Sequence, residues 1–137
     1  MSKFIFGTKI GIAGIGGFLA YALGGFDTVL KTLLALMIID YISGILKAIY
    51  NKKLNSGIGF KGIIKKVMIL LVVALASIIQ HAVISDIPIR EVVIMFYVAN
   101  EGISIIENIG TVIPIPDKIK VLFEQLKEKD DGRDKNL

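Results

Sequence analysis

Apolar residues along this chain fall into four long runs, separated by short polar or glycine-rich segments. A transmembrane helix needs about 20 mostly apolar residues, and each run reaches or approaches that length. The runs predict helices over about residues 8–25, 28–50, 61–84 and 89–109. We therefore expect an all-α membrane protein with about four transmembrane helices. The glycines of the first run allow it either to span the bilayer or to lie at the interface.

The chain changes character after the fourth run. Pro114 and Pro116 stop a regular helix because proline lacks an N–H donor and fixes the backbone. Asp117 can then cap a short amphipathic helix, on which one face carries Ile119, Leu122, Phe123 and Leu126. We expect a transmembrane domain over residues 1–112, a Pro-containing turn and amphipathic cytoplasmic helix over 113–128, and a disordered tail over 129–137.

Glycine recurs along the first run at helical spacing. Small residues at such spacing let helix backbones approach closely in lipid. A glycine-weakened helix without a packing role is the alternative, and a signal peptide cleaved after Ala20-Tyr21-Ala22 is another. The candidate packing positions are Gly7, Gly11, Gly14 and Gly17.

Composition supports the membrane interpretation. Hydrophobic residues make up 54% of the chain and the mean hydropathy is +0.72, which is too apolar for an ordinary soluble domain of this size. The chain has no cysteine, which excludes a disulfide framework and a thiolate metal site. The net charge of +4 does not indicate nucleic-acid binding, because the positive residues flank the apolar runs.

Lysine and arginine also predict the orientation. If the N-terminus, the loop over residues 51–66 and the C-terminus share one side, that side holds 14 of the 16 basic residues. By the positive-inside rule, both ends are then cytoplasmic, an N-in/C-in topology. The basic residues of the cytoplasmic loop are Lys52, Lys53, Lys61, Lys65 and Lys66.

Two of the predicted helices carry polar stripes at membrane depth. In the second helix, Asp40, Ser43, Gly44 and Lys47 share one face. A central aspartate costs roughly 2.5 to 3.5 kcal/mol on insertion scales, so we expect this face to meet protein or water and not lipid. The stripe of the fourth helix comprises Tyr97, Asn100, Glu101, Ser104, Glu107 and Asn108.

Two explanations of the stripes are open. A closed bundle could satisfy them internally, for example with Asp40 and Glu101 protonated or hydrogen-bonded, or they could face water in some functional state. Catalytic chemistry is not indicated, because the sequence shows no metal-ligand spacing, phosphate loop or nucleophile motif. We expect no enzymatic activity, no cofactor and no metal.

Several short segments, in fixed order, resemble the toxin-secretion/phage-lysis holin family. They are "IDYISGILKAIYNKKLNSGIGFKGIIKKV" (39–67), "YVANEGISIIENIG" (97–110) and "PIPDKIK" (114–120), and the resemblance covers roughly residues 27–127. The matching positions are Asp40, Gly44, Lys47, Ala48, Ser56, Gly62, Lys66, Glu101, Ser104, Ile105, Asn108, Pro114 and Pro116.

The resemblance implies a non-enzymatic protein of the bacterial (host) cytoplasmic membrane that forms homo-oligomers and opens large lesions. An endolysin, or in some relatives a toxin, would leave through the lesion without direct contact, and an antiholin would be a further partner. We hypothesise that the two polar stripes form the lesion wall. Asp40→Leu and Glu101→Leu should then insert well but fail to permeabilise.

Two other functions fit part of the pattern. A small proton-coupled transporter or channel also has short helices and a membrane carboxylate, but dimeric drug exporters usually carry the key glutamate in the first helix. Here no charge lies between Ile10 and Phe26. An antiholin-type regulator would share the whole scaffold and differ only in making no lesion itself.

Overall fold

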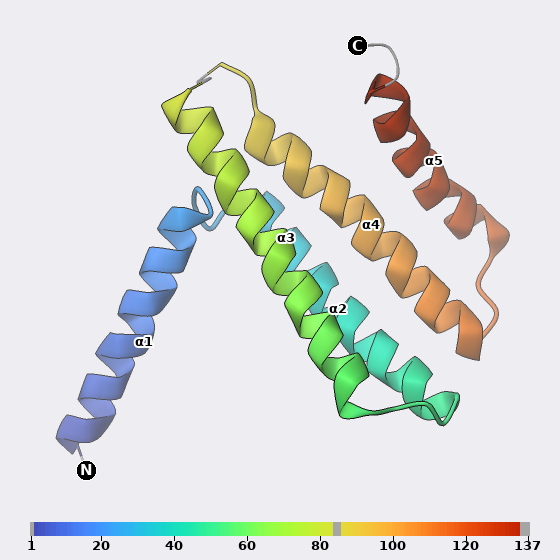
Figure 1. Cartoon of the computed structure of the whole chain (residues 1–137), viewed down its shortest axis with the longest axis horizontal. Coiled ribbons are helices and arrows are strands. Elements are labelled where there is room, and N and C mark those ends of the chain that lie inside the picture. Colours follow the sequence, from blue (N-terminus) through green and yellow to red (C-terminus); the bar gives the residue numbers. More distant parts are fainter. Residues whose placement is uncertain (1, 84–85, 135–137) are drawn as a thin grey trace.

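The computed structural model describes the backbone of residues 2–83 and 86–134 and is helical throughout (Figure 1). About 85% of the described residues are helical, and they contain no strand, which confirms the all-α fold class. The elements are α1 (Ser2–Ala22), α2 (Thr28–Tyr50), α3 (Ser56–Ala82), α4 (Ile89–Val112) and α5 (Asp117–Asp134).

Side-chain caps explain where α2 and α3 begin. The Asp27 carboxylate accepts a hydrogen bond of 3.0 Å from the backbone N–H of Leu30. The Asn55 side chain accepts one of 3.0 Å from the N–H of Ile58. Both caps satisfy a donor that the first helical turn would leave unpaired.

The helix bounds differ from the expected ones mainly at the ends. Helix α3 begins at Ser56 and not near residue 61, because Asn55 caps it. Helix α1 begins at Ser2 instead of near residue 8. Helix α5 continues to Asp134, so residues 129–134, expected to be disordered, are helical. Good helix formers in "EQLKEK" carry the helix past residue 128, while residues 135–137 lie outside the described part.

The helices α2, α3 and α4 form one bundle, whereas α1 stands apart from it (Figure 1). Helix α4 contacts α2, α3 and α5, and within the described residues α1 contacts only α3. No residue of α1 is buried. The apolar core of the bundle comprises Leu30, Leu33, Met37, Ile69, Val73 and Ile94.

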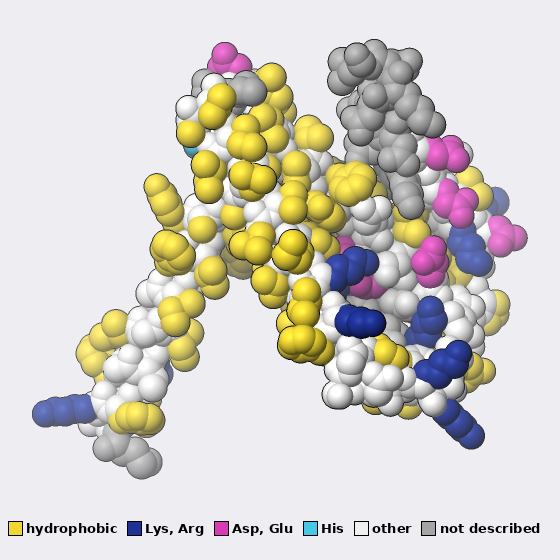
Figure 2. All heavy atoms as spheres, viewed as in Figure 1, with side chains coloured by type: hydrophobic (Ala, Val, Ile, Leu, Met, Phe, Trp, Pro, Cys, Tyr) yellow, Lys and Arg dark blue, Asp and Glu magenta, His cyan; other side chains and the backbone are white. Residues whose placement is uncertain are grey.

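Four helices are long and apolar enough to cross a membrane, namely α1 to α4. Many of their large apolar side chains point outward, and Figure 2 shows them covering much of the visible surface. In water such a surface would be a liability, but in a bilayer it is the surface that lipid covers. Most of the positive side chains visible on the bundle lie toward the end that carries the α2–α3 loop, and others lie on α1 (Figure 2).

Helix α5 folds back along α4 (Figure 1). Its anchor is Phe123, whose ring lies so close to Gly102 that a Cβ at this glycine would overlap it. The absence of a side chain at Gly102 therefore allows Phe123, and with it α5, to pack against α4.

Candidate functional site

One face of α2 changes from apolar to polar halfway along the helix. Leu30, Leu33, Met37, Asp40 and Ser43 are all buried, at spacings of three or four residues that keep them on one side. The N-terminal part of this face, from Leu30 to Met37, belongs to the apolar core. The change of character comes at Asp40, which is only 8% exposed.

Lys66 of α3 joins Asp40 of α2 to Glu101 of α4. Its Nζ donates a 2.7 Å hydrogen bond to Asp40 Oδ2 and another 2.7 Å bond to Glu101 Oε2. Glu101 is 1% exposed and the Lys66 side chain 14% exposed. We call these three residues the ion cluster. It connects all three helices of the bundle at one level.

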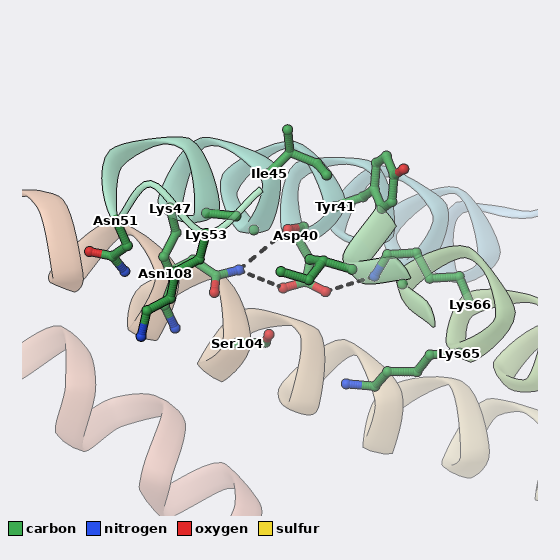
Figure 3. A pocket seen from close by; sticks show the side chains of 14 residues that line it. Asp40, Tyr41, Ile45, Lys47, Asn51, Lys53, Lys65, Lys66, Ser104 and Asn108 are labelled. Carbon is green, nitrogen blue, oxygen red and sulfur yellow. Dashed lines mark hydrogen bonds and ion pairs between the residues drawn. The ribbon is translucent and has the colours of Figure 1, made fainter. Parts of the chain in front are cut away.

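Asn108 of α4 extends this network toward the α2–α3 loop. Its Nδ2 donates to Asp40 Oδ1 at 3.1 Å (Figure 3). It also donates to the Ser43 hydroxyl oxygen at 3.1 Å. The Ser43 hydroxyl in turn donates to the backbone carbonyl of Asp40 at 3.0 Å. The two polar stripes thus meet and satisfy one another, as the closed-bundle explanation expects, but through a lysine.

The structure does not bring all the candidate residues together. Tyr97 packs against the apolar core. Asn100 and Glu107 line an adjoining hollow of about 520 Å³ between α3 and α4. This hollow is also lined by Tyr97, Lys65, Glu101 and Ser104. The residues that share the neighbourhood of the ion cluster are Asp40, Ser43, Gly44, Lys47, Glu101, Ser104 and Asn108.

The candidate packing glycines have no partner within the described chain. A Cβ added at any of them would meet no atom of another segment within 4 Å. Packing through these positions would therefore require a second chain, and it stays a prediction. The glycines are Gly7, Gly11, Gly14 and Gly17.

Beside the ion cluster lies a cavity of about 360 Å³, which we call the basic pocket (Figure 3). Four lysines line it together with Asp40, two asparagines and several small or apolar residues. Of the five lysines assigned to the cytoplasmic loop, Lys53, Lys65 and Lys66 line the pocket, while Lys52 and Lys61 do not. The basic segment thus contains three lysines that line the pocket and two that do not.

A second buried cation closes the opposite end of the bundle. Arg90 is 1% exposed. Its Nη1 donates to Asp27 Oδ2 at 2.8 Å, its Nη2 to the carbonyl of Gly25 at 2.9 Å, and its Nε to the carbonyl of Leu23. The backbone N–H of Arg90 donates to Gln80 Oε1 at 2.8 Å. Arg90 therefore ties the α1–α2 turn to α3 and α4.

Gly24 makes this arrangement possible. Its φ of +82° is in the left-handed region, which favours glycine. A Cβ there would also come within 2.5 Å of Ser77 Oγ and 2.6 Å of Arg90 Cδ. Both the backbone conformation and the lack of space require glycine at this position.

Asp27 lies just before α2, and its ionisation responds to Arg90. The hydrogen bond from the guanidinium holds the pKa of the Asp27 carboxyl below its ordinary value, although burial acts in the opposite direction. The carboxylate is thus charged throughout the physiological pH range.

Sequence reasoning missed Lys66 as a partner of the stripes and Arg90 as a buried anchor. Asn55 was an available signal for the first, because an asparagine cap moves the start of α3 upstream and puts Lys66 well inside the helix. For Arg90, the available signal was its position, because under the predicted topology nearly all other basic residues lie at the opposite end of the helices.

Known proteins similar to this chain are found in bacteria and in a phage. Uncharacterized protein Lin0175 of Listeria innocua is 42% identical over 116 residues, which cover 84% of this chain and 83% of the relative. Uncharacterized protein Lmo0128 of Listeria monocytogenes is 40% identical over 134 residues, with 94% and 96% covered. A "Probable holin" of Bacillus phage phi105 is 38% identical over 110 residues, with 74% and 82% covered. No solved structure gives a significant match.

The bacteriophage holin family matches residues 17–128. That range contains α2, α3 and α4 with the ion cluster, the basic pocket and the Arg90 anchor, and it contains only the end of α1. Together with the four apolar helices, the match identifies a multi-pass membrane protein. This chain belongs to the bacteriophage holin family.

Proposed function

We propose that this protein acts as a holin, which oligomerises in the bacterial cytoplasmic membrane and opens lesions that release an endolysin or a toxin. Family membership supports the general role. The proposed orientation is N-in/C-in, with the basic pocket on the cytoplasmic side, because 14 of the 16 basic residues then lie there.

The observation that carries the proposal is the buried ion cluster. Removing charges from water is costly, and the attraction between them recovers that cost only in part. If α2 and α4 separated, Asp40, Lys66 and Glu101 would exchange their mutual ion pairs for hydration. The stripes can therefore be buried in a closed bundle and wetted in an open one at a modest difference in free energy. A lesion wall needs this property.

The first test measures lesion formation in cells. The chain is expressed from an inducible promoter with and without a cytosolic endolysin that has no export signal, and culture density and membrane potential are followed. We expect abrupt lysis only with the endolysin, after a delay and together with sudden loss of potential. Unchanged density in both cultures would contradict the proposal.

Variants of the two buried carboxylates test the wall. Asp40→Leu and Glu101→Leu should accumulate in the membrane but should not release the endolysin. Glu128→Leu, which replaces an exposed carboxylate of α5, is the matched control and should lyse normally. Full lysis by both buried variants would show that the polar stripes do not form the lesion wall.

Two further measurements on cells that express this chain distinguish a holin from an antiholin and from a transporter. Delayed lysis by a second, known holin, with no lysis by this chain alone, would assign it an antiholin role. Proton flux linked to a small solute, with no release of the endolysin, would assign it a transporter role.

A further inference from the structure

The basic pocket has an unbalanced positive charge. Lys47, Lys53, Lys65 and Lys66 line it, and Asp40 is the acidic residue in its lining. Glu101 pairs with Lys66 from just outside the lining, so four positive charges and two negative charges leave a net charge of +2. Lys66 is already paired with Asp40 and Glu101. Within the described residues, the other three lysines make no ion pair. An anionic group would supply the missing partner.

The rest of the lining favours an amphiphile over a free anion. Ile45, Ala48 and Ile58 form an apolar part, and Asn51 and Asn108 add hydrogen-bonding groups. A volume of about 360 Å³ is within the usual range of ligand pockets. A phosphate next to the lysines, with its glycerol and first acyl carbons along the apolar part, matches this division of the surface.

The position of the pocket in the chain is that of a membrane surface. Lys47 lies in the last turn of α2, and Lys53 lies in the loop between α2 and α3. Figure 3 shows the two side chains on the same side of the cavity as Asn51. Basic pockets between transmembrane helices at the cytoplasmic surface bind anionic lipid headgroups.

We propose that the basic pocket binds the phosphate headgroup of an anionic phospholipid of the inner leaflet. The occupant uses Lys47, Lys53 and Lys65 as its charge partners, and Lys66 stays in the ion cluster. This binding goes beyond the proposed lysis function and does not depend on lesion formation. It can therefore be measured on the purified protein, whether or not the protein lyses cells.

The test uses the purified full-length chain in a neutral detergent. It is titrated with phosphatidylglycerol that carries a fluorescent acyl chain, and unlabelled phosphatidylglycerol, phosphatidylcholine and inorganic phosphate are added as competitors. We expect saturable binding that unlabelled phosphatidylglycerol displaces and the other two do not. Displacement by inorganic phosphate at similar concentration would show a free-anion site, and displacement by phosphatidylcholine would show an unspecific apolar one. Either result overturns the proposal.

Two double variants with the same loss of charge locate the binding. Lys53→Gln/Lys65→Gln removes two pocket lysines. Lys52→Gln/Lys61→Gln removes two neighbours that do not line the pocket. At about fivefold per lysine, the first should weaken binding roughly 25-fold and the second less than about threefold. Equal weakening by the two variants, both still helical by circular dichroism, would show diffuse surface attraction and reject the pocket.

Discussion

Lys66 and Glu101 lie 35 positions apart in the sequence, and their side chains meet in a 2.7 Å ion pair that is nearly closed to solvent. Asp40 accepts from the same ammonium at 2.7 Å, so a single cation serves two carboxylates from two helices. Removal of the lysine would leave both carboxylates close together without a counter-charge. The stability of the α2–α3–α4 bundle should therefore depend strongly on this residue.

We expect Lys66→Met to lower the free energy of unfolding by about 3 kcal/mol, the usual cost of leaving a buried charge unpaired. Denaturation in mixed micelles, followed by circular dichroism, measures the change. Lys65→Met, at an exposed neighbouring position, should change stability by less than about 0.5 kcal/mol. The uncharged triple variant Asp40→Asn/Lys66→Met/Glu101→Gln should recover most of the loss. A triple variant no more stable than Lys66→Met would mean that packing, and not charge, holds the cluster.

A reversible cross-link can test whether the bundle must open. Ser43 Oγ and Asn108 Nδ2 are 3.1 Å apart, and the chain has no cysteine of its own. A direct disulfide needs Cβ atoms about 3.8 Å apart, so Ser43→Cys/Asn108→Cys is treated with a short bis-methanethiosulfonate cross-linker, which joins the two thiols through disulfides. The cross-link should lock α2 to α4 and prevent endolysin release, and a membrane-permeant reductant should restore release. The single-cysteine variants show the effect of losing each hydrogen bond. Release that is equally fast in the cross-linked and reduced double variant would rule out separation of these helices.

Acid should weaken the end of the bundle that Arg90 holds. Because the pKa of Asp27 is lowered in the folded protein, its contribution to stability is complete above the ordinary aspartate pKa of about 3.9. That contribution is lost as the pH falls through the lowered value. Arg90 also contacts Glu91 Oε1 at 3.2 Å, so the thermal unfolding of Asp27→Asn and Glu91→Gln should be compared between pH 7 and pH 3. Asp27→Asn should be less stable at pH 7 and lose less on acidification. The same acid loss in Asp27→Asn and the wild type would assign the effect to other groups.

The glycines of α1 separate folding from association. Because a Cβ at Gly7 or Gly11 meets nothing, Gly7→Leu/Gly11→Leu should not lower the unfolding free energy of the chain, and the higher helix propensity of leucine should stabilise α1. If these glycines pack between copies, the variant should self-associate less, as measured by chemical cross-linking in membranes. Ile12→Ala, also on exposed α1, is the control. If the leucine variant cross-links as much as the wild type, the glycines have no role in packing between copies.

The packing of α5 against α4 depends on the absence of a side chain at Gly102. A side chain at Gly102 would overlap the ring of Phe123, so Gly102→Val should release α5 and make it cleavable by a protease several-fold faster. Gly110→Ala is the control, because its Cβ would meet Ile115 only at an ordinary 3.8 Å. Unchanged protection in Gly102→Val would show that other contacts dominate this interface.

Sequence reasoning predicted the helices and the two stripes well, because these depend on local periodicity and hydropathy. The spacing of Asp40 and Ser43 alone put them on one face, and the depth of Glu101 in an apolar run indicated that it would meet protein or water and not lipid. Neither inference needs knowledge of how one helix sits against another.

The pairing with Lys66 could not be obtained in this way. It depends on the register between α2 and α3, which the length of the loop and the start of α3 determine together. The anchor at Arg90 depends on the carbonyls of Leu23 and Gly25 in a left-handed turn, which no side-chain pattern reveals. Both the Lys66 pairing and the Arg90 anchor therefore become visible only when the tertiary structure is known.

The level of the ion cluster also has a consequence for the lipid around the protein. Asp40 follows Thr28 by 12 residues and Glu101 follows Arg90 by 11, so at about 1.5 Å per residue the cluster is only about 18 Å from the end of the bundle that Arg90 closes. A bilayer core is about 30 Å thick, and beyond the cluster the basic pocket is lined by lysines. If the bundle spans the bilayer with its Arg90 end at one surface, we expect the lipids that face the basic pocket to shorten or tilt, at an elastic cost of fractions of a kcal/mol per Å. Neighbouring copies that share one thinned zone divide this cost, so the bilayer itself would draw them together as they accumulate.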